Sequence, residues 1–230
     1  MMIPEISIIV PAWNEGNRIE ETLGAIRRGC ARLPKAELIV VDDGSRDATF
    51  ELAIPWADLV VQHPQCYGKG TALNTGRKMA KGQILVFLDA DLGSTAEAFT
   101  DLVEPLVRGD CDMVIAVLPE AKTKGGIGLV KQLAKRGVYR LCGFETTAPL
   151  SGQRAVQSEM LDRIGRLAEG FGVEVGLTID AIKLGYRVQE KTIAFSHRES
   201  GRDLLGWYHR GKQFCAVGGT LWNRWRQPIC

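Results

Sequence analysis

The feature that most constrains the fold is an apolar run that ends in two carboxylates. Residues 84–88 are too few to be anything but a buried strand, and Asp89 and Asp91 follow directly. Because strand side chains alternate, both carboxylates are expected to point the same way at the strand's carboxyl end, where open α/β sheets bind ligands. Like charges this close favour a cation between them, and their hard oxygens suit Mg²⁺ or Mn²⁺. Taken alone, the Asp-x-Asp motif is equally compatible with a solvated turn.

Further strand-like runs alternate with helical patterns along the first half of the chain. The strand-like runs are 6–10, 38–41, 59–61, 84–88 and 113–117, and the helical patterns are 18–28, 72–80 and 96–107. This alternation predicts an α/β fold with a mostly parallel central sheet flanked by helices. A glycine-rich stretch at 124–128 is expected to form a mobile loop. Beyond it we expect a strand or turn at 150–156, helices at 159–168 and 174–184, and a strand at 187–195.

Composition narrows the class of protein. With 230 residues, of which 45% are hydrophobic, the chain can bury a full core and is expected to form one domain, residues 1–230. Its formal net charge of +2 argues against a nucleic-acid partner. The six cysteines contain no Cys-x-x-Cys pair, which favours reduced thiols in a cytoplasm over zinc or a disulfide framework. The sequence has neither a signal-peptide pattern nor an apolar run of membrane-spanning length.

Polar loops also follow the first two predicted strands. Residues 11–15 and 42–47 are expected at the same rim as Asp89 and Asp91, so these loops should converge on one cleft. Asp43 can accept hydrogen bonds from uracil or guanine, and Trp13 offers a flat face for a base. The alternatives are a helix N-cap with a glycine turn for 42–47 and a core position for Trp13.

A third loop, residues 67–70, opens a predicted helix with the sequence Tyr-Gly-Lys-Gly. It lacks the spacing of a Walker loop. Lys69 and free backbone N–H groups at a helix start can nevertheless lie beside an anion. A flexible surface turn with a solvated lysine is the alternative.

Four motifs follow one another in a characteristic order. They are Pro11-Ala12-x-Asn14-Glu15, Asp42-Asp43-Gly44-Ser45-x-Asp47, Gly68-Lys69-Gly70-x-Ala72-Leu73-Asn74-x-Gly76 and Leu88-Asp89-Ala90-Asp91. Together they resemble the family 2 glycosyltransferases of GT-A fold. The resemblance is close over the first half and extends more weakly to the end, nearest the dolichyl- or polyprenyl-phosphate mannose and glucose synthases.

This resemblance implies a Rossmann-like GT-A domain, a nucleotide-sugar donor and Mg²⁺ or Mn²⁺. Residues 1–120 would form the nucleotide-sugar-binding half, and 121–230 the acceptor-side half with an amphipathic C-terminal segment. By position, the donor site would comprise Pro11, Trp13, Glu15 and Asp43 around the nucleoside, Lys69 near the base or ribose, and Asp89 with Asp91 around the metal diphosphate.

The acceptor half matches the family less completely. Residues 151–155 resemble the Ser-Gly-Phe-Arg-Ala segment of the lipid-phosphate sugar synthases, with Gln153 in place of the aromatic residue. Arg154 is then a candidate phosphate contact, or else a surface arginine on an edge strand. Glu174 is a candidate base or acceptor-positioning group, although the familiar Glu-Asp pair is absent. A phosphate acceptor, already ionised, would need no base, and an acid at a helix N-terminus is the alternative for Glu174.

Two further segments complete the resemblance. His197 is a candidate metal ligand, and Arg198 and Arg202 are candidates to pair with the diphosphate or an acidic acceptor. Residues 204–225 interleave aromatic and basic side chains. Such a segment suits either an anionic membrane surface or packing against the domain.

The sequence therefore predicts a metal-dependent enzyme that moves one sugar from a UDP- or GDP-sugar to an acceptor, with inversion as the resemblance implies. The acceptor is a polyprenyl phosphate or another small molecule, and the protein is expected in the cytoplasm, with peripheral contact to the inner face of the membrane. Asp91, with Asp89, is expected to hold the metal against the leaving diphosphate. The alternatives are a nucleotidyltransferase and a non-catalytic sugar-nucleotide-binding protein associated with the membrane.

Overall fold

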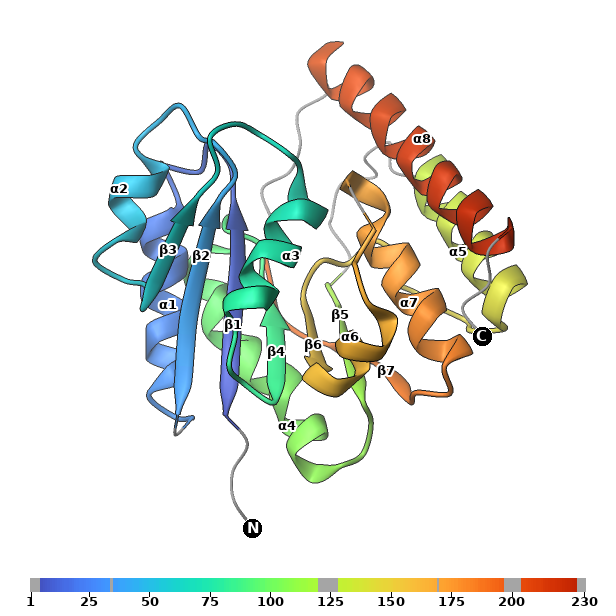
Figure 1. The fold of residues 1–230 in the computed structure, drawn as a ribbon, viewed down its shortest axis with the longest axis horizontal. Coiled ribbons are helices and arrows are strands. Elements are labelled where there is room, and N and C mark those ends of the chain that lie inside the picture. Colours follow the sequence, from blue (N-terminus) through green and yellow to red (C-terminus); the bar gives the residue numbers. More distant parts are fainter. Residues whose placement is uncertain (1–4, 34, 120–127, 169, 197–203, 227–230) are drawn as a thin grey trace.

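The computed structural model describes residues 5–33, 35–119, 128–168, 170–196 and 204–226, which form a central sheet with helices on both faces (Figure 1). The strands are β1 Ile6–Ala12, β2 Ala36–Asp42, β3 Leu59–Gln62, β4 Ile84–Phe87, β5 Met113–Val117, β6 Arg154–Gln157 and β7 Val188–Thr192. The helices are α1 Ile19–Cys30, α2 Thr49–Ala53, α3 Lys69–Met79, α4 Thr100–Arg108, α5 Gly128–Cys142, α6 Ser158–Ile164, α7 Val173–Lys183 and α8 Leu204–Arg226.

The sheet has the strand order β3-β2-β1-β4-β6-β5-β7. All of its pairings are parallel except those of β6, which runs antiparallel to both β4 and β5. The predicted mostly parallel α/β sheet is therefore confirmed. The inserted antiparallel strand matters for function because it brings residues 151–154 from the second half of the chain beside the end of β4.

Alternating residues of β1 show how the sheet divides the core. Ile8 and Val10 pack in a cluster with Leu23 of α1, whereas Ile9 packs in a second cluster with Leu73 of α3. All of these side chains are buried. This pattern of period two is what a strand buried on both faces requires.

The structure differs from the predicted elements in three places. The sequence analysis did not predict α2 or α5, and the helix predicted at 96–107 is a 3₁₀ turn, Gly93–Phe99, followed by α4. The predicted glycine-rich loop lies outside the described residues except for Gly128, which begins α5.

Helices α5, α7 and α8 pack together beside the sheet. Val138 of α5, Ile179 of α7 and Val217 of α8 belong to one buried cluster, and Arg224 of α8 donates two hydrogen bonds of 2.6 Å to buried Asp180 of α7. In the described part of the chain, no helix combines the length and the apolar character needed to cross a membrane.

Gly172, just before α7, sets how closely α8 can approach. A Cβ atom there would lie 2.9 Å from Thr220 Cβ and 3.0 Å from the Ala216 carbonyl oxygen. We therefore expect Gly172→Ala to lower the free energy of unfolding by about 2 kcal/mol, because overpacking forces the helices apart. Thermal denaturation tests this, with Gly218→Ala as the control, because Gly218 has open space around it on α8. An equal effect of the two substitutions would contradict the packing argument.

Candidate active site

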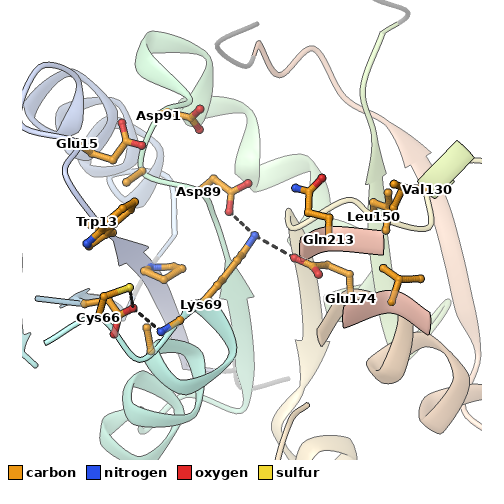
Figure 2. Close-up of a pocket in the computed structure, with 17 residues that line it drawn as sticks. Trp13, Glu15, Cys66, Lys69, Asp89, Asp91, Val130, Leu150, Glu174 and Gln213 are labelled. Atoms are coloured by element: carbon orange, nitrogen blue, oxygen red, sulfur yellow. Dashed lines mark hydrogen bonds and ion pairs between the residues drawn. The ribbon is translucent and has the colours of Figure 1, made fainter. Parts of the chain in front are cut away.

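A cavity of about 720 Å³ opens at the carboxyl edge of β1, β2 and β4. Eight of the predicted site residues line it, namely Pro11, Trp13, Glu15, Asp43, Lys69, Asp89, Asp91 and Glu174. Figure 2 shows Trp13 and Glu15 on one side of the cavity, Gln213 and Leu150 on the other, and Lys69 reaching between them. The structure thus gathers residues from both halves of the chain around one space.

Hydrogen bonds between two loops brace the side of this cavity where the resemblance places the nucleoside. Asn14 donates its backbone N–H to Ser45 Oγ at 2.8 Å and accepts from the Arg46 backbone N–H at 2.9 Å. Its φ of 55° lies in the left-handed region, which asparagine tolerates better than most residues. Gly16 donates its backbone N–H to Asp47 at 3.0 Å.

Trp13 therefore sits on a braced loop. Its side chain is 50% exposed and faces the cavity, so the alternative of a core position is wrong. An exposed aromatic face on a rigid loop is suited to stacking against a base.

Asp43 is buried and uses both carboxylate oxygens inside the protein. Oδ1 accepts from the Tyr67 backbone N–H at 3.0 Å and lies 2.7 Å from His63 Nδ1; Oδ2 accepts from the Gly68 backbone N–H at 2.6 Å and from Cys66 Sγ at 3.2 Å. Four contacts occupy the positions at which a carboxylate normally accepts. Asp43 thus fixes the start of α3, and its contact with a base stays a prediction.

Lys69 is the first residue of α3 and forms the central ion-pair bridge of the site. Its Nζ lies 2.6 Å from Asp89 Oδ1 and 3.1 Å from Glu174 Oε1 (Figure 2). Burial by itself would lower the pKa of Lys69, but the charges of Asp89 and Glu174 outweigh it and raise the pKa above its ordinary value. The bridge joins the first half of the chain to α7 in the second half, a connection that the sequence analysis did not predict.

Asp89 is held from a second direction by the segment that precedes β6. Gln153, which is fully buried, donates from Nε2 to Asp89 Oδ2 at 2.7 Å. Gly152 leaves no space beside this carboxylate, since a Cβ atom there would lie 3.0 Å from Asp89 Oδ1. Both oxygens of Asp89 therefore already hold protein donors, and a metal could bind there only by rearranging those contacts.

Asp91 lies two residues further along the chain, at the rim of the same cavity (Figure 2). β4 ends at Phe87, so both aspartates belong to a turn and the alternation of strand side chains does not apply to them. The turn is instead anchored to α1, because Thr22 Oγ1 donates to the Ala90 carbonyl at 2.8 Å and Arg18 to the Asp91 carbonyl at 3.2 Å. The two carboxylates face one cavity, as predicted, for a different structural reason.

Replacing Gln153 tests how far Asp89 depends on that amide. We expect Gln153→Glu to weaken binding of the nucleotide-sugar donor that the resemblance implies by about tenfold or more, because a second carboxylate would be buried against Asp89. Gln153→Leu should cost about 1–2 kcal/mol of stability by removing a buried hydrogen bond. Calorimetric titration with a donor nucleotide and thermal melts measure the two effects, and wild-type affinity in Gln153→Glu would contradict this role.

Arg154 does not line the cavity. Its side chain is 1% exposed on β6, which lies between β4 and β5, so the alternative of a surface arginine on an edge strand is wrong. It donates to the Ser151 carbonyl and to Thr178 Oγ1, each at 2.8 Å. Burial lowers the pKa of Arg154 to about 10, although Glu174 and Glu190 oppose this shift. Arg154 thus braces α7 from behind the cavity wall.

Other residues were missed by sequence analysis or lie outside the described part of the chain. Cys66, Val130, Leu150, Gln213 and Val217 also line the cavity. None of them belongs to a predicted motif. Val130, Gln213 and Val217 are brought there by α5 and α8, whereas Cys66 lies in the loop before α3 and Leu150 in the segment before β6. His197, Arg198 and Arg202 lie outside the described residues.

The carboxylates fit a hard divalent cation. Mg²⁺ is usually held by one or two carboxylates together with substrate phosphates, and Asp91 offers one carboxylate at the edge of a cavity large enough for a nucleotide. Asp89 could add a second only if its contacts with Lys69 and Gln153 rearranged. Within the described ranges, no group of three or more His, Cys, Asp or Glu side chains is arranged to hold a metal. The remaining ligands would then come from the diphosphate, water or residues outside those ranges.

The fold and the site define a glycosyltransferase of the GT-A type. The chain resembles the crystal structure of glucosyl-3-phosphoglycerate synthase from Mycobacterium tuberculosis in complex with Mn²⁺, UDP-glucose and phosphoglyceric acid, with a TM-score of 0.81 and 30% identity over 98% of this chain and 81% of that one.

The sequence model of glycosyl transferase family 2 matches residues 7–161. The chain therefore belongs to glycosyl transferase family 2. In sequence it is 32% identical to the glucosyl-3-phosphoglycerate synthase of Mycobacterium tuberculosis over 87% of this chain and 69% of that protein. It is 30% identical to the undecaprenyl-phosphate 4-deoxy-4-formamido-L-arabinose transferase of Pseudomonas aeruginosa, over 60% of this chain and 42% of that protein. The prediction of a glycosyltransferase is confirmed.

Proposed function

We propose that the protein transfers one sugar from a UDP-sugar to a small or lipid-linked acceptor that bears a phosphate, with Mn²⁺ or Mg²⁺ as cofactor. The observation that carries this proposal is that Trp13, Lys69, Asp89 and Asp91 line one cavity in a chain of this family. The structural relative with 30% identity binds UDP-glucose and Mn²⁺, which favours a uridine nucleotide over GDP.

On the donor side, each residue has a distinct proposed role. Trp13 stacks on the base, Glu15 contacts the nucleoside, and Asp43 keeps the loop at residues 66–68 in place beneath it. Asp91 is the principal metal ligand, with Asp89 beside it. A bound divalent metal would neutralise the charge that develops on the departing diphosphate. Lys69 adds a fixed positive charge between Asp89 and the acceptor half.

On the acceptor side, Glu174 is proposed to position the acceptor rather than to remove a proton from it. Its carboxylate is engaged by Lys69 at 3.1 Å at the start of α7, and an ionised phosphate acceptor needs no base. A phosphate-bearing acceptor is favoured because the names of the two relatives contain phosphoglycerate and undecaprenyl phosphate. Arg198 and Arg202 are proposed to pair with that phosphate or the diphosphate, and His197 to complete the metal site.

For a lipid-linked acceptor, transfer is proposed to take place at the inner face of the membrane, with the protein in the cytoplasm and in peripheral contact with that face. Inversion at the anomeric carbon stays a prediction, which the proton NMR spectrum of the product tests.

The test is turnover of purified protein with UDP-glucose, other UDP-sugars and GDP-mannose, with and without Mn²⁺. Phosphoglycerate and polyprenyl phosphate are offered as acceptors, and release of nucleoside diphosphate is measured together with the glycosylated product. We expect metal-dependent release of UDP coupled to product formation with one acceptor. Release of pyrophosphate from nucleoside triphosphates, or donor binding without any turnover, would contradict the proposal.

A further inference from the structure

Exposed apolar side chains are concentrated on two neighbouring helices. Among the described residues, five of the ten exposed large hydrophobic side chains lie on α5 and α8: Leu129, Tyr139, Phe214, Trp222 and Trp225. The two helices lie side by side (Figure 1), with Gly137 of α5 directly against the side chain of Leu221 of α8. We call their exposed residues, including Lys131, Arg136, Arg140 and Arg226, the α5–α8 surface.

The charge of these helices is entirely positive. The sequences of α5 and α8 contain eight lysine and arginine residues and no aspartate or glutamate. The whole chain carries a formal charge of only +2, so the rest of it is net acidic. Such segregation of charge creates a local positive field that attracts an anionic partner.

Aromatic and cationic side chains meet at the C-terminal end of α8. The rings of Trp222 and Trp225 lie 5.1 Å apart, and the guanidinium of Arg226 lies 5.6 Å from the Trp222 ring centroid. Both tryptophans are more than half exposed, so packing against the domain does not account for them. Tryptophan and arginine together are typical of helices that lie in the interface of a membrane.

The inner faces of the same helices form a wall of the cavity. Val130 of α5, and Gln213 and Val217 of α8, line it. A surface formed by these helices therefore adjoins the acceptor side of the site. A lipid held at that surface would have its headgroup close to the cavity.

We propose that the α5–α8 surface docks the protein on an anionic lipid bilayer, with both helices lying in the headgroup region. A second copy of the chain fits this surface less well, because a symmetric contact would bring two wholly basic helix pairs together. The inference rests on the proposed function only for its lipid-linked acceptor, and binding to a bilayer is measurable without turnover.

The test is sedimentation of the full chain with vesicles of phosphatidylcholine alone or mixed with phosphatidylglycerol. We expect binding only to the anionic vesicles, and weakening as salt is raised. Each basic residue near an anionic surface strengthens binding about fivefold, so Arg136→Glu with Arg140→Glu should weaken it about 25-fold or more. Trp222→Ala with Trp225→Ala should weaken it by at least about tenfold.

Matched controls separate this surface from general effects of charge and hydrophobicity. Lys78→Glu with Arg163→Glu makes the same change of charge on exposed positions of α3 and α6, and Ile54→Ala removes an exposed apolar side chain from the end of α2. These variants should bind vesicles as wild type does. Donor binding and release of UDP from a soluble donor, measured in every variant, show whether the catalytic site is intact.

Three results of the vesicle assay would overturn the inference. They are equal binding to neutral and anionic vesicles, absence of binding to either, and wild-type binding by the arginine or tryptophan variants. A dimer in sedimentation velocity that dissociates in Trp222→Ala with Trp225→Ala would also overturn it, and would assign the surface to a second copy. None of these results affects the proposed transfer from a UDP-sugar, which is judged by the soluble assay.

Discussion

Asp91→Ala is expected to lower kcat by about a thousandfold or more while leaving the fold intact. Asp91 lies at the rim of the cavity, on a turn anchored to α1 through backbone atoms. Truncation of its side chain should therefore remove the proposed principal metal ligand without disturbing the turn. Loss of the charge stabilisation at a leaving group is worth several kcal/mol in the transition state, which corresponds to this factor.

The measurement is the rate of sugar transfer at saturating donor and Mn²⁺, together with circular dichroism and thermal melting. Asp101→Ala is the matched control, because Asp101 is an exposed aspartate in the first turn of α4 and lies outside the cavity lining. A folded Asp91→Ala protein with activity within tenfold of wild type would contradict the assigned role.

Lys69→Met is expected to affect both stability and activity. Removing the ammonium leaves the carboxylates of Asp89 and Glu174 in a largely buried site without the positive charge that pairs with both of them. Breaking a buried ion pair in this way typically costs about 3 kcal/mol in the free energy of unfolding. The first half of the chain would also lose its connection to α7, so we expect transfer to fall by at least about a hundredfold.

The pH dependence distinguishes an ion-pair role from a packing role. Because the folded protein raises the pKa of Lys69 above its ordinary value of 10.5, the bridge contributes fully below that pH and is lost as the pH rises through the folded value. The stability difference between wild type and Lys69→Met should therefore be constant from neutral pH to about 10 and shrink above it. Lys78→Met, at an exposed position of the same helix, is the control. A difference that does not change at high pH would contradict the ion-pair role.

The sheet could be predicted from sequence because its strands are short apolar runs followed by polar turns. The strand expected at 84–88 corresponds to β4, whose residues are all buried. The antiparallel direction of β6 could not be predicted, because alternation of side chains along a strand is the same in both directions. Helix α5 was missed because two glycines and five lysine, arginine or glutamine residues interrupt its apolar pattern, and contact with α7 and α8 stabilises it.

Sequence analysis could predict which individual motif residues line the cavity. It could not predict the contacts between residues from distant segments of the chain. Trp13, Asp43, Asp89 and Asp91 each end a strand or follow one, and all line the cavity. The partners of Lys69 and Asp89 were not predictable, because Glu174 and Gln153 reach them from α7 and the segment before β6. Arg154 shows the opposite case: a charged residue in a motif suggested a ligand contact, yet its guanidinium is buried in the interior.

The most direct test of the account is the position of the metal in a crystal grown with UDP and Mn²⁺. Anomalous scattering locates Mn²⁺ independently of the surrounding chain. We predict a single strong peak in the cavity, bonded to the Asp91 carboxylate and to oxygens of the diphosphate, with the uracil ring against Trp13. A diphosphate bound elsewhere, or a metal without contact to Asp91, would contradict the central claim. That claim is that this cavity binds a nucleotide sugar, with a divalent metal between Asp91 and the diphosphate.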